Sequence, residues 1–415
     1  MAQAESSEKE KPSDEQEVMK GTSAVAKGVM AADPDVISAY PITPQTGVVE
    51  KLSELVADGK LDSEFIKVDS EFNAASTCIG ASAAGARAFS ATSSQGLKLM
   101  SEPLFTAAGM RLPIVMAVAN RSLSAPLSIW ADHTDAFAER DGGMLQFHAE
   151  DVQEAIDHVL LGFRVAEQVN LPALSNFDGF ILTHVQEPAN IPSEEDVSEF
   201  LPPRDPEYTL DPSDPKTMGA YARPEHWTES RYEIQRAMME ARGVWADAVE
   251  EFKDVFGRDY TEYGGMLDTY YADDADHIVV AMGSIAGTIR NVVDAYREDG
   301  KKVGMVRPRV FRPFPAPELR DALADAENVA VLTKEMSPGY ESAFAGEIKG
   351  ALYHAESQPP IKSYVLGMAG RDVKPEDIAD IIEDVKTATP KMDFDESESW
   401  PQLRPELLQN GGDDK

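Results

Sequence analysis

Cysteine is almost absent from the sequence, because Cys78 is the only one in 415 residues. A single cysteine excludes an intrachain disulfide, and one thiolate cannot hold an iron–sulfur cluster. Cys78 stands among small apolar residues, which favours a buried structural thiol over a nucleophile. We therefore expect any iron–sulfur cluster that this protein uses to lie on another chain.

Cations are also scarce. The sequence has 38 Lys and Arg against 73 Asp and Glu, a formal net charge of −35. Nucleic acids and anionic membranes are bound by clustered Lys and Arg, so we expect neither as a partner. Because the acidic residues are spread over the whole chain, they favour a surface adapted to high salt. An ordinary acidic cytosolic protein is the alternative.

Long apolar runs and familiar catalytic motifs are missing too. The longest dense apolar run, residues 112–119, is far shorter than the about 18 residues of a membrane span. No secretory signal is visible at the N-terminus, so we expect a cytoplasmic protein. There is no GxSxG, HExxH, P-loop or CxxC motif, and the seven histidines lack metal-ligand spacing. His133, flanked by Asp132 and Asp135, fits the start of a helix better than a metal ligand or a base, and no metal site is predicted.

What is present is material for a large core, with 42% hydrophobic and 8% aromatic residues. In the first half, short apolar runs alternate with segments of helical length. The runs predict strands at residues 36–39, 65–68, 88–92, 113–119 and 173–177, with helices at 71–86 and 152–168 among them. Strands that are apolar throughout indicate a parallel sheet covered on both faces, which is an α/β fold.

The second half predicts another α/β unit beyond a connector. Its expected strands are 277–282, 302–306, 329–333 and 363–367, and its expected helices are 285–298, 317–324 and 340–353. The connector, residues 188–224, is rich in Pro and Asp, and a charged helix over 229–256 follows it. A coiled-coil arm is one interpretation of this helix, but it is short, and we expect it to pack on a domain or a neighbouring subunit. The predicted organisation is a flexible acidic tail (1–17), a first domain (18–187), the connector and helix (188–265), a second domain (266–386) and an acidic tail (387–415).

Three polar elements stand at predicted strand ends of the first domain. The first is YPITPQT at residues 40–46, where two prolines fix φ around Thr43. Thr43 would present its hydroxyl at the carboxyl edge of the sheet, where α/β proteins usually bind ligands. The alternative is that Thr43 only caps the next helix.

The second element is VDSEFNAA at residues 68–75, in which Glu71 falls in the first turn of a helix. An exposed Glu that faces the helix dipole is the simpler interpretation. However, the Ala-, Gly- and Ser-rich run 74–86 indicates close packing around it. A carboxyl buried there would have a raised pKa and would be able to donate a proton.

The third element is VANRSL at residues 118–123, in which Arg121 ends a buried strand. A planar carboxylate suits the guanidinium fork, so Arg121 is a candidate anion ligand, with a structural ion pair as the alternative. In the second domain, Gly283 and Ser284 follow a strand and open a helix. This turn is either an anion site or a plain tight turn.

These motifs together resemble a known family. Segments 40–46, 70–75, 91–97 (ATSSQGL), 120–128, 178–180, 282–287 (MGSIAG) and 312–315 (RPFP) are similar to the α subunits of pyruvate:ferredoxin oxidoreductases (pyruvate synthases). These enzymes are thiamine-diphosphate-dependent 2-oxoacid:ferredoxin oxidoreductases. The resemblance covers residues 18–355. It implies a pyrimidine-type thiamine-diphosphate-binding domain followed by a transketolase C-terminal-like domain.

The resemblance also implies roles for individual residues. Glu71 matches the glutamate that hydrogen-bonds N1′ of the aminopyrimidine, and Thr43 and Arg121 match the pair that holds the carboxylate and keto group of the substrate. Ser94 and Gln95 lie in a loop near the cofactor. Phe72 departs from the family pattern, in which His or Ala often follows the glutamate.

The partners follow from the same resemblance. A β subunit would hold the diphosphate and Mg²⁺, and γ and δ ferredoxin-like chains would carry the clusters. The implied reaction is oxidative decarboxylation of pyruvate with coenzyme A to acetyl-CoA and CO₂, with reduction of ferredoxin. Alternatives are the same chemistry on 2-oxoisovalerate, 2-oxoglutarate or phenylglyoxylate, or a non-catalytic α/β subunit that binds a partner or a small anion.

Overall fold

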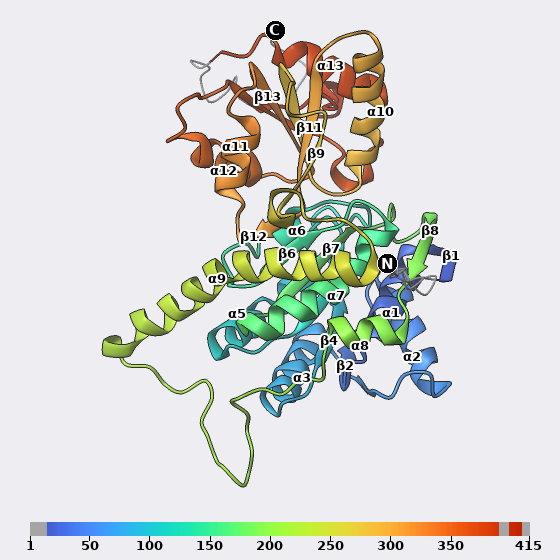
Figure 1. The fold of residues 1–415 in the computed structure, drawn as a ribbon, viewed down its shortest axis with the longest axis vertical. Coiled ribbons are helices and arrows are strands. Elements are labelled where there is room, and N and C mark those ends of the chain that lie inside the picture. The colour runs from blue at the N-terminus through green and yellow to red at the C-terminus, as the bar shows by residue number, and fades with distance from the viewer. Residues whose placement is uncertain (1–14, 390–397, 409–415) are drawn as a thin grey trace, which may run out of the picture.

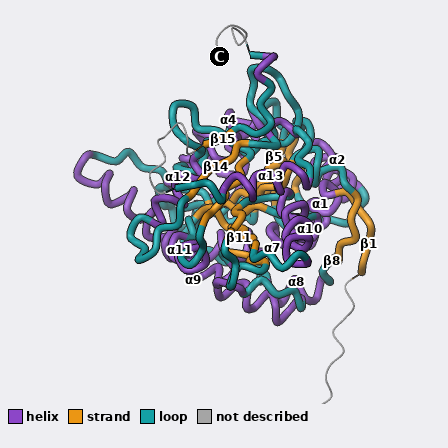
Figure 2. Tube along the Cα trace, turned by 90° about the horizontal axis from the view of Figure 1, so that it is seen from above, coloured by secondary structure: helices purple, strands orange, loops and turns teal. Residues whose placement is uncertain are grey.

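The computed structural model describes residues 15–389 and 398–408. Its two main β-sheets, each covered by helices, form two bodies that lie one above the other in Figure 1. Viewed from above in Figure 2, the strands of the two main sheets lie in the middle and helices surround them. The α/β fold predicted from the sequence is confirmed.

The first sheet has seven strands in the order β12-β6-β7-β5-β4-β2-β3. Neighbouring strands are parallel except that β12 is antiparallel to β6. The bounds are β2 Val36–Ala39, β3 Glu64–Lys67, β4 Ala88–Thr92, β5 Val115–Asn120, β6 Leu145–His148, β7 Ala173–Asp178 and β12 Val310–Arg312. The five strands expected here are confirmed to within two residues at each end, whereas β6 and β12 were not predicted.

Helices cover both faces of this sheet. They are α1 Gly21–Ala32, α2 Thr46–Ala57, α3 Glu71–Ala83, α4 Ser94–Leu99, α5 Ser101–Met110, α6 Thr134–Phe137 and α7 Val152–Val169. Side chains of α1, α2 and α7 pack with one set of alternate strand residues. Side chains of α3, α4 and α5 pack with the other set, and Cys78 is buried among them. The period-two alternation of the strands therefore fills two separate cores.

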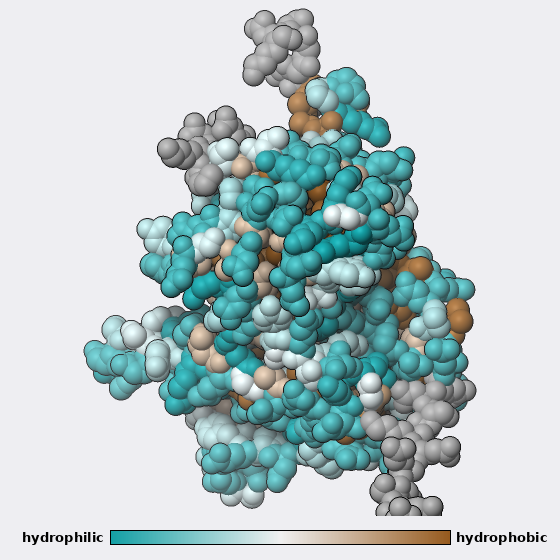
Figure 3. Space-filling model, turned by 45° about the horizontal axis from the view of Figure 1, so that its top comes forward, coloured by the Kyte–Doolittle hydropathy of each residue, from teal (hydrophilic) through white to brown (hydrophobic). Residues whose placement is uncertain are grey.

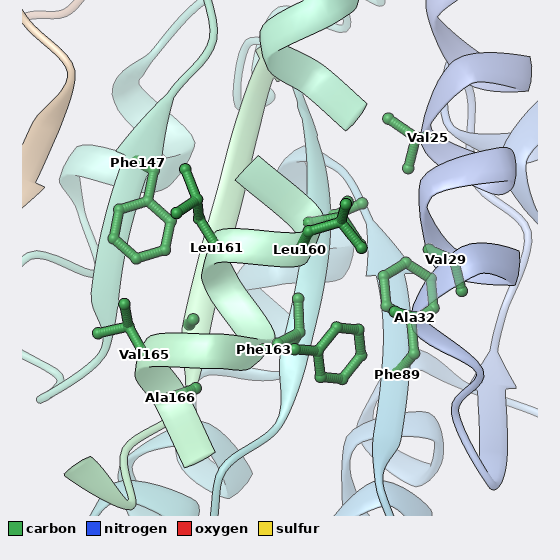
Figure 4. Close-up of a cluster of buried hydrophobic side chains, with 14 of the residues drawn as sticks. Val25, Val29, Ala32, Phe89, Phe147, Leu160, Leu161, Phe163, Val165 and Ala166 are labelled. Atoms are coloured by element: carbon green, nitrogen blue, oxygen red, sulfur yellow. The ribbon is translucent and has the colours of Figure 1, made fainter. Parts of the chain in front are cut away.

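Helix α7 shows how local sequence produces this packing. The Asp151 side chain accepts a hydrogen bond from the Glu154 backbone N–H at 2.8 Å and caps the start, and Asn170 ends the helix in a left-handed conformation. Figure 4 shows the apolar side chains of α7 facing Phe147 of β6, Phe89 of β4 and the apolar residues of α1. Each large side chain buried in this way contributes about 1.5–3 kcal/mol to folding.

The connector contains regular structure that was not predicted. β8 (Gln186–Ile191) pairs antiparallel with β1 (Glu15–Lys20), and Figure 2 shows the two side by side at the rim. Helix α8 (Glu194–Phe200) follows. The tail expected over 1–17 is therefore wrong for residues 15–17, which belong to β1, and residues 1–14 lie outside the described part of the chain.

The charged helix is longer than predicted. α9 spans Pro224–Phe256, and its first residue is a proline, which is favoured at a helix start because the missing N–H is not needed there. Its second half packs on α7 through buried side chains that include Trp245 and Phe252, as expected of a helix that covers a domain. Residues 224–230, at the start of the helix, are exposed and extend away from the body (Figure 1). α9 has 33 residues. Within the described segments, however, neither α9 nor any other helix has an apolar stretch of the length that a membrane span requires.

The second sheet has six strands in the order β15-β14-β13-β10-β11-β9. Only β9 is antiparallel to its neighbour. The strands are β9 Leu267–Tyr270, β10 His277–Val280, β11 Val303–Pro308, β13 Asn328–Thr333, β14 Ile361–Val365 and β15 Glu398–Ser399. Helices α11 (Ala316–Leu323) and α12 (Ala343–Leu352) cover one face, and α10 (Ile285–Glu298) and α13 (Pro375–Val385) cover the other.

Short 3₁₀ turns and the C-terminal segment complete the description. The turns are η1 Glu262–Gly265, η2 Met368–Gly370 and η3 Pro405–Leu407. The acidic tail expected from residue 387 is wrong for β15, which pairs with β14 at the edge of the second sheet. Residues 390–397 and 409–415 of that expected tail lie outside the described part.

The two bodies are joined by more than the chain itself. β12, from the second half of the sequence, adds an edge strand to the first sheet. Arg307 and Arg309 both donate to Glu154 on α7, at 2.7 and 3.0 Å. Burial alone would raise the pKa of Glu154, but the two guanidinium groups hold it well below its usual range. These buried ion pairs hold the second body at a fixed position on the first.

Candidate functional site

The candidate site lies at the carboxyl edge of the first sheet. The strands β3, β2, β4 and β5 are consecutive neighbours and parallel, so their carboxyl ends lie side by side. The three polar elements predicted from the sequence follow β2, β3 and β5, and the turn with Ser94 and Gln95 follows β4. The fold thus brings together at one edge the residues that the sequence analysis selected.

Glu71 is the first residue of α3 and is buried, with 8% of its surface exposed. The Ser70 hydroxyl caps this helix by accepting from the Asn73 backbone N–H. Within residues 15–389 and 398–408, nothing donates a hydrogen bond to the Glu71 carboxyl and no cation pairs with it. The interpretation as an exposed glutamate is therefore wrong, and a buried carboxyl is left free for a ligand.

Gly96 makes room for this carboxyl. A Cβ atom added at Gly96 would lie 2.8 Å from Glu71 Oε1 and 2.5 Å from Thr92 Oγ1. Such distances are too short for non-bonded atoms, so any larger residue at position 96 would displace Glu71. The ATSSQG turn therefore needs glycine at its last position because of Glu71.

Arg121 and Thr43 lie together. The Arg121 guanidinium donates to the carbonyl oxygens of Thr43 at 2.8 Å and Ser128 at 3.1 Å, and to Gln95 Oε1 at 3.4 Å. In the described part of the chain no carboxylate contacts this guanidinium, so the structural ion pair considered above is not formed. Burial lowers the pKa of Arg121, but an arginine keeps its charge in proteins. A buried cation that is bound only by neutral oxygens is a strong site for an anion.

Thr43 does not cap a helix. Helix α2 begins at Thr46, its N-cap is Gln45, and no side chain caps it. The Thr43 side chain is exposed. The interpretation of Thr43 as only a helix cap is therefore wrong.

Ser94 and Gln95 form the turn between β4 and α4. Ser94 has a φ of 49°, a left-handed conformation that is unfavourable for a residue with a side chain and that is common at functional sites. Its hydroxyl lies 2.5 Å from the Ser122 carbonyl oxygen and 2.6 Å from Gln95 Oε1. The turn after β4 is thereby bound to the segment that carries Arg121.

Several buried polar atoms around the turn have no partner in the described part of the chain. They are Gln45 Oε1, Ser90 Oγ, Thr92 Oγ1, Ser93 Oγ and Gln95 Nε2. Each buried polar atom without a hydrogen bond lowers the free energy of unfolding by about 1–3 kcal/mol. Several such atoms close together therefore indicate that a ligand or water binds there. Together with the Glu71 carboxyl, they offer both donors and acceptors of hydrogen bonds to a polar ligand.

Two residues of this site were not selected from the sequence. The Gln45 side chain donates to the carbonyl oxygens of Tyr40 at 2.9 Å and Ala91 at 3.2 Å and so links the ends of β2 and β4. The Asp135 carboxylate accepts from the backbone N–H groups of Ser94 and Arg121. Asp135 was noticed only as a neighbour of His133, since no local pattern marks it as part of the site.

His133 is a satisfied structural histidine, as predicted. Its Nε2 lies 2.5 Å from Asp178 Oδ1, and it stands at the start of α6. Within the described segments, no group of three His, Cys, Asp or Glu side chains is arranged to hold a metal.

Asp178 also explains the Gly283-Ser284 turn. The backbone N–H of Ser284 donates to Asp178 at 3.1 Å, and Lys334 Nζ lies 2.7 Å from the same carboxylate. Burial alone would raise the pKa of Asp178, but Lys334 and His133 hold it well below its usual range. The anion at this turn is thus a carboxylate of the protein itself.

Cys78 is fully buried, and burial raises the pKa of its thiol to about 12. A thiol with this pKa is protonated at neutral pH and is a poor nucleophile. The prediction of a structural cysteine is confirmed.

Comparisons with known proteins identify relatives of this chain. The family model "Pyruvate flavodoxin/ferredoxin oxidoreductase, thiamine diP-bdg" matches residues 27–250, and the model "Pyruvate:ferredoxin oxidoreductase core domain II" matches residues 275–378. The chain is 48% identical over 394 residues to pyruvate synthase subunit PorA of Methanocaldococcus jannaschii, which covers 94% of this chain and 98% of that protein. It is 45% identical over 388 residues to ketoisovalerate oxidoreductase subunit VorA of Pyrococcus abyssi, which covers 93% and 98%.

A solved structure shares the fold. A 2-oxoglutarate:ferredoxin oxidoreductase from Magnetococcus marinus, with 2-oxoglutarate, coenzyme A and succinyl-CoA bound, superimposes with a TM-score of 0.69 at 19% sequence identity. The match covers 89% of this chain and 65% of that chain, so this chain spans just under two thirds of the larger protein. From the family models and the relatives together, the chain belongs to the pyruvate flavodoxin/ferredoxin oxidoreductase family, as the resemblance of its motifs predicted.

Proposed function

We propose that this chain is the α subunit of a heteromeric enzyme that oxidatively decarboxylates pyruvate. Pyruvate and coenzyme A give acetyl-CoA, CO₂ and one proton, and the two electrons released reduce ferredoxin. The observation that carries this proposal is the buried Glu71 carboxyl, which has no partner within residues 15–389 and 398–408 and lies at the same sheet edge as the Arg121–Thr43 pair. The relatives named as pyruvate synthase subunits support the choice of pyruvate.

The residues present fit thiamine diphosphate. When bound, this cofactor supplies the nucleophilic carbon and the electron sink that decarboxylation of a 2-oxoacid requires. Glu71 would hold a proton against N1′ of the aminopyrimidine, which is acid–base work suited to a buried carboxyl. Ser94 and Gln95 would border the ring, and the unpartnered polar atoms of the β4 end supply donors and acceptors for it.

Arg121 and Thr43 would orient the substrate. The guanidinium offers two parallel N–H groups to a planar carboxylate, and Thr43 places a hydroxyl within reach of the keto oxygen. Because Arg121 donates to the Thr43 backbone, the two groups are held at one relative position before substrate arrives. Fixing the carboxylate in this way reduces the entropy that the reaction would otherwise lose.

The remaining functions are proposed to lie on partner chains. A β subunit would bind the diphosphate through Mg²⁺, and γ and δ ferredoxin-like subunits would carry the iron–sulfur clusters. The single buried cysteine supports this division, since one protonated thiol cannot ligate a cluster. Pyruvate, coenzyme A and ferredoxin would be substrates of the complex.

The test is 2-oxoacid-dependent ferredoxin reduction by the purified complex. Pyruvate, 2-oxoisovalerate, 2-oxoglutarate and phenylglyoxylate are each offered with coenzyme A, and omission of coenzyme A is the control. We expect the highest kcat/KM with pyruvate. A higher value with another 2-oxoacid contradicts the assignment to pyruvate, and no activity with any of them contradicts the enzyme assignment.

One observation favours a second candidate. The VorA relative is only three percentage points less identical than the PorA relative, 45% against 48%. A branched 2-oxoacid such as 2-oxoisovalerate is therefore the alternative substrate. The same panel separates the two.

A further inference from the structure

Asp135 lies at the centre of the candidate site although no part of it is exposed. Its Oδ2 accepts from the backbone N–H of Ser94 at 2.9 Å and from the backbone N–H of Arg121 at 3.0 Å. These two residues follow different strands, β4 and β5. One carboxylate oxygen therefore bridges the turn that contains Ser94 and the segment that contains Arg121.

The other oxygen fixes the carboxylate itself. Oδ1 accepts from Asn120 Nδ2 at 2.9 Å and from the backbone N–H of Ala136 at 2.8 Å. An ionised carboxylate has about four acceptor positions, and here four donors use them. Burial raises the pKa of Asp135 to about 6, whereas the four hydrogen bonds act in the opposite direction and favour the ionised form.

The position of this charge leaves the guanidinium of Arg121 open. Asp135 bonds to the Arg121 backbone, whereas the guanidinium contacts the neutral oxygens of Thr43, Ser128 and Gln95. The negative charge of Asp135 nevertheless favours the charged form of Arg121. A carboxylate bound directly to the guanidinium would compensate the same charge but would occupy the fork that a substrate needs.

We propose that Asp135 is a positioning residue, which holds the backbone of Arg121 and the backbone of the Ser94 turn at a fixed separation. It also supplies the counter-charge of Arg121 without occupying the guanidinium. The role in catalysis rests on the proposed function, in which Arg121 binds the substrate carboxylate. The anchoring of the two backbone segments is a property of the chain itself.

The test compares Asp135→Asn with Asp157→Asn in the assembled complex. Asp157 is a matched control because it is equally buried but bonds to Arg258 and Tyr260, away from this sheet edge. We expect Asp135→Asn to raise KM for pyruvate at least tenfold, with a smaller fall in kcat. Asp157→Asn should lower the melting temperature and leave KM within twofold of the wild type. An unchanged KM in Asp135→Asn, or an equal increase in both variants, overturns the proposal.

A second measurement does not depend on turnover. In hydrogen exchange of the complex, Asp135→Asn should speed exchange of the Ser94 and Arg121 amides at least tenfold. An uncharged amide oxygen accepts hydrogen bonds more weakly than a carboxylate oxygen, and the NH₂ group of an Asn would face donors on one of the two sides. Unchanged exchange at both amides overturns the anchoring. If the complex turns over no 2-oxoacid while both amides become faster, the proposed function fails and the anchoring stands.

A milder variant covers the case in which Asp135→Asn does not assemble. Asn120→Ala removes one of the four donors to the carboxylate. We expect a threefold or greater rise in KM for pyruvate, and an unchanged KM contradicts the proposal.

Discussion

At the scale of single residues, the candidate site is a set of buried polar groups that lack a hydrogen-bond partner or a counter-ion in the described part of the chain. Glu71 has no partner in the described part of the chain, and the guanidinium of Arg121 has only neutral ones. Leaving such groups unpaired lowers the free energy of unfolding. A ligand that binds at this sheet edge and forms hydrogen bonds with these groups would explain why they lie together there.

Gly96 gives the sharpest residue-scale prediction. Gly96→Ala places a Cβ 2.8 Å from Glu71 Oε1 and 2.5 Å from Thr92 Oγ1, so the carboxyl has to move. A misplacement of about 1 Å in a catalytic group can cost about 100-fold in rate. We therefore expect Gly96→Ala to lower the rate of pyruvate turnover at least about 100-fold.

Gly80→Ala is the matched control for Gly96→Ala. Gly80 lies within α3, and an added Cβ there meets nothing within 4 Å. Alanine in a helix interior is about 0.5–1 kcal/mol more stable than glycine, so this variant should keep its activity and gain slightly in thermal stability. Equal activity of the two variants would contradict the role given to Gly96.

The sequence allowed only part of this site to be predicted. Thr43, Glu71 and Arg121 could be selected from the sequence because each follows an apolar run that predicts a strand. Gln45 and Asp135 were not, because their roles depend on bonds to Ala91 and Ser94, 46 and 41 residues away along the chain. Such contacts are set by strand order, and no local pattern encodes them.

At the scale of elements, apolar runs predicted most strands of the first sheet but missed β6, β8 and β12. β4 and β5 are buried along their whole length, and their sequences, AFSAT and VMAVAN, are mostly apolar. β8 is half exposed, and β12 has only three residues, so neither has a recognisable period. Their pairing with β1 and β6 is a tertiary effect.

Helix α9 offers a prediction at this scale. Trp245 is 1% exposed and stacks on Phe147 of β6, with ring centroids 4.5 Å apart. Trp245→Ala would leave a large cavity and lower the free energy of unfolding by about 3–5 kcal/mol, measured by denaturant titration. Trp227→Ala, on the same helix but 59% exposed, should change it by no more than about 0.5 kcal/mol. Equal effects would mean that α9 does not pack on α7 as described.

At the scale of the whole molecule, the two bodies meet at buried charges. Lys334, at the end of β13, pairs with Asp178, at the end of β7, at 2.7 Å. Lys334→Met leaves Asp178 buried without its cation and should lower the free energy of unfolding by about 3–5 kcal/mol. Lys301→Met, in which an exposed lysine 3.7 Å from Asp299 is replaced, should cost at most about 1 kcal/mol.

The effect of Lys334→Met should also depend on pH, with a definite sign. The pKa of Asp178 is held well below its usual range in the folded wild-type protein, so the unfolded chain binds the proton first as the pH falls. The stability from this pair is complete above about pH 4 and is lost as the pH falls further. The difference between wild type and Lys334→Met should therefore shrink below pH 4, and a difference that grows there would contradict the assignment.

The net charge of −35 belongs to the same scale. Hydrophilic residues cover most of the face shown in Figure 3, and repulsion among many carboxylates is screened by salt. If the surface is adapted to high salt, the melting temperature should rise from low to molar KCl in a thermal scan. A flat or falling melting temperature would support the ordinary acidic protein instead.

In the proposed function, Glu71 works on the cofactor as a buried acid–base group. The most direct measurement is the rate of hydrogen–deuterium exchange at C2 of thiamine diphosphate bound to the complex, for the wild type and for Glu71→Gln. Glu167→Gln is the control, since Glu167 pairs with Arg87 away from the site. We expect exchange to be at least about 100-fold slower in Glu71→Gln and unchanged in the control. Exchange within twofold of the wild type in Glu71→Gln, with the cofactor still bound, would contradict this role of Glu71.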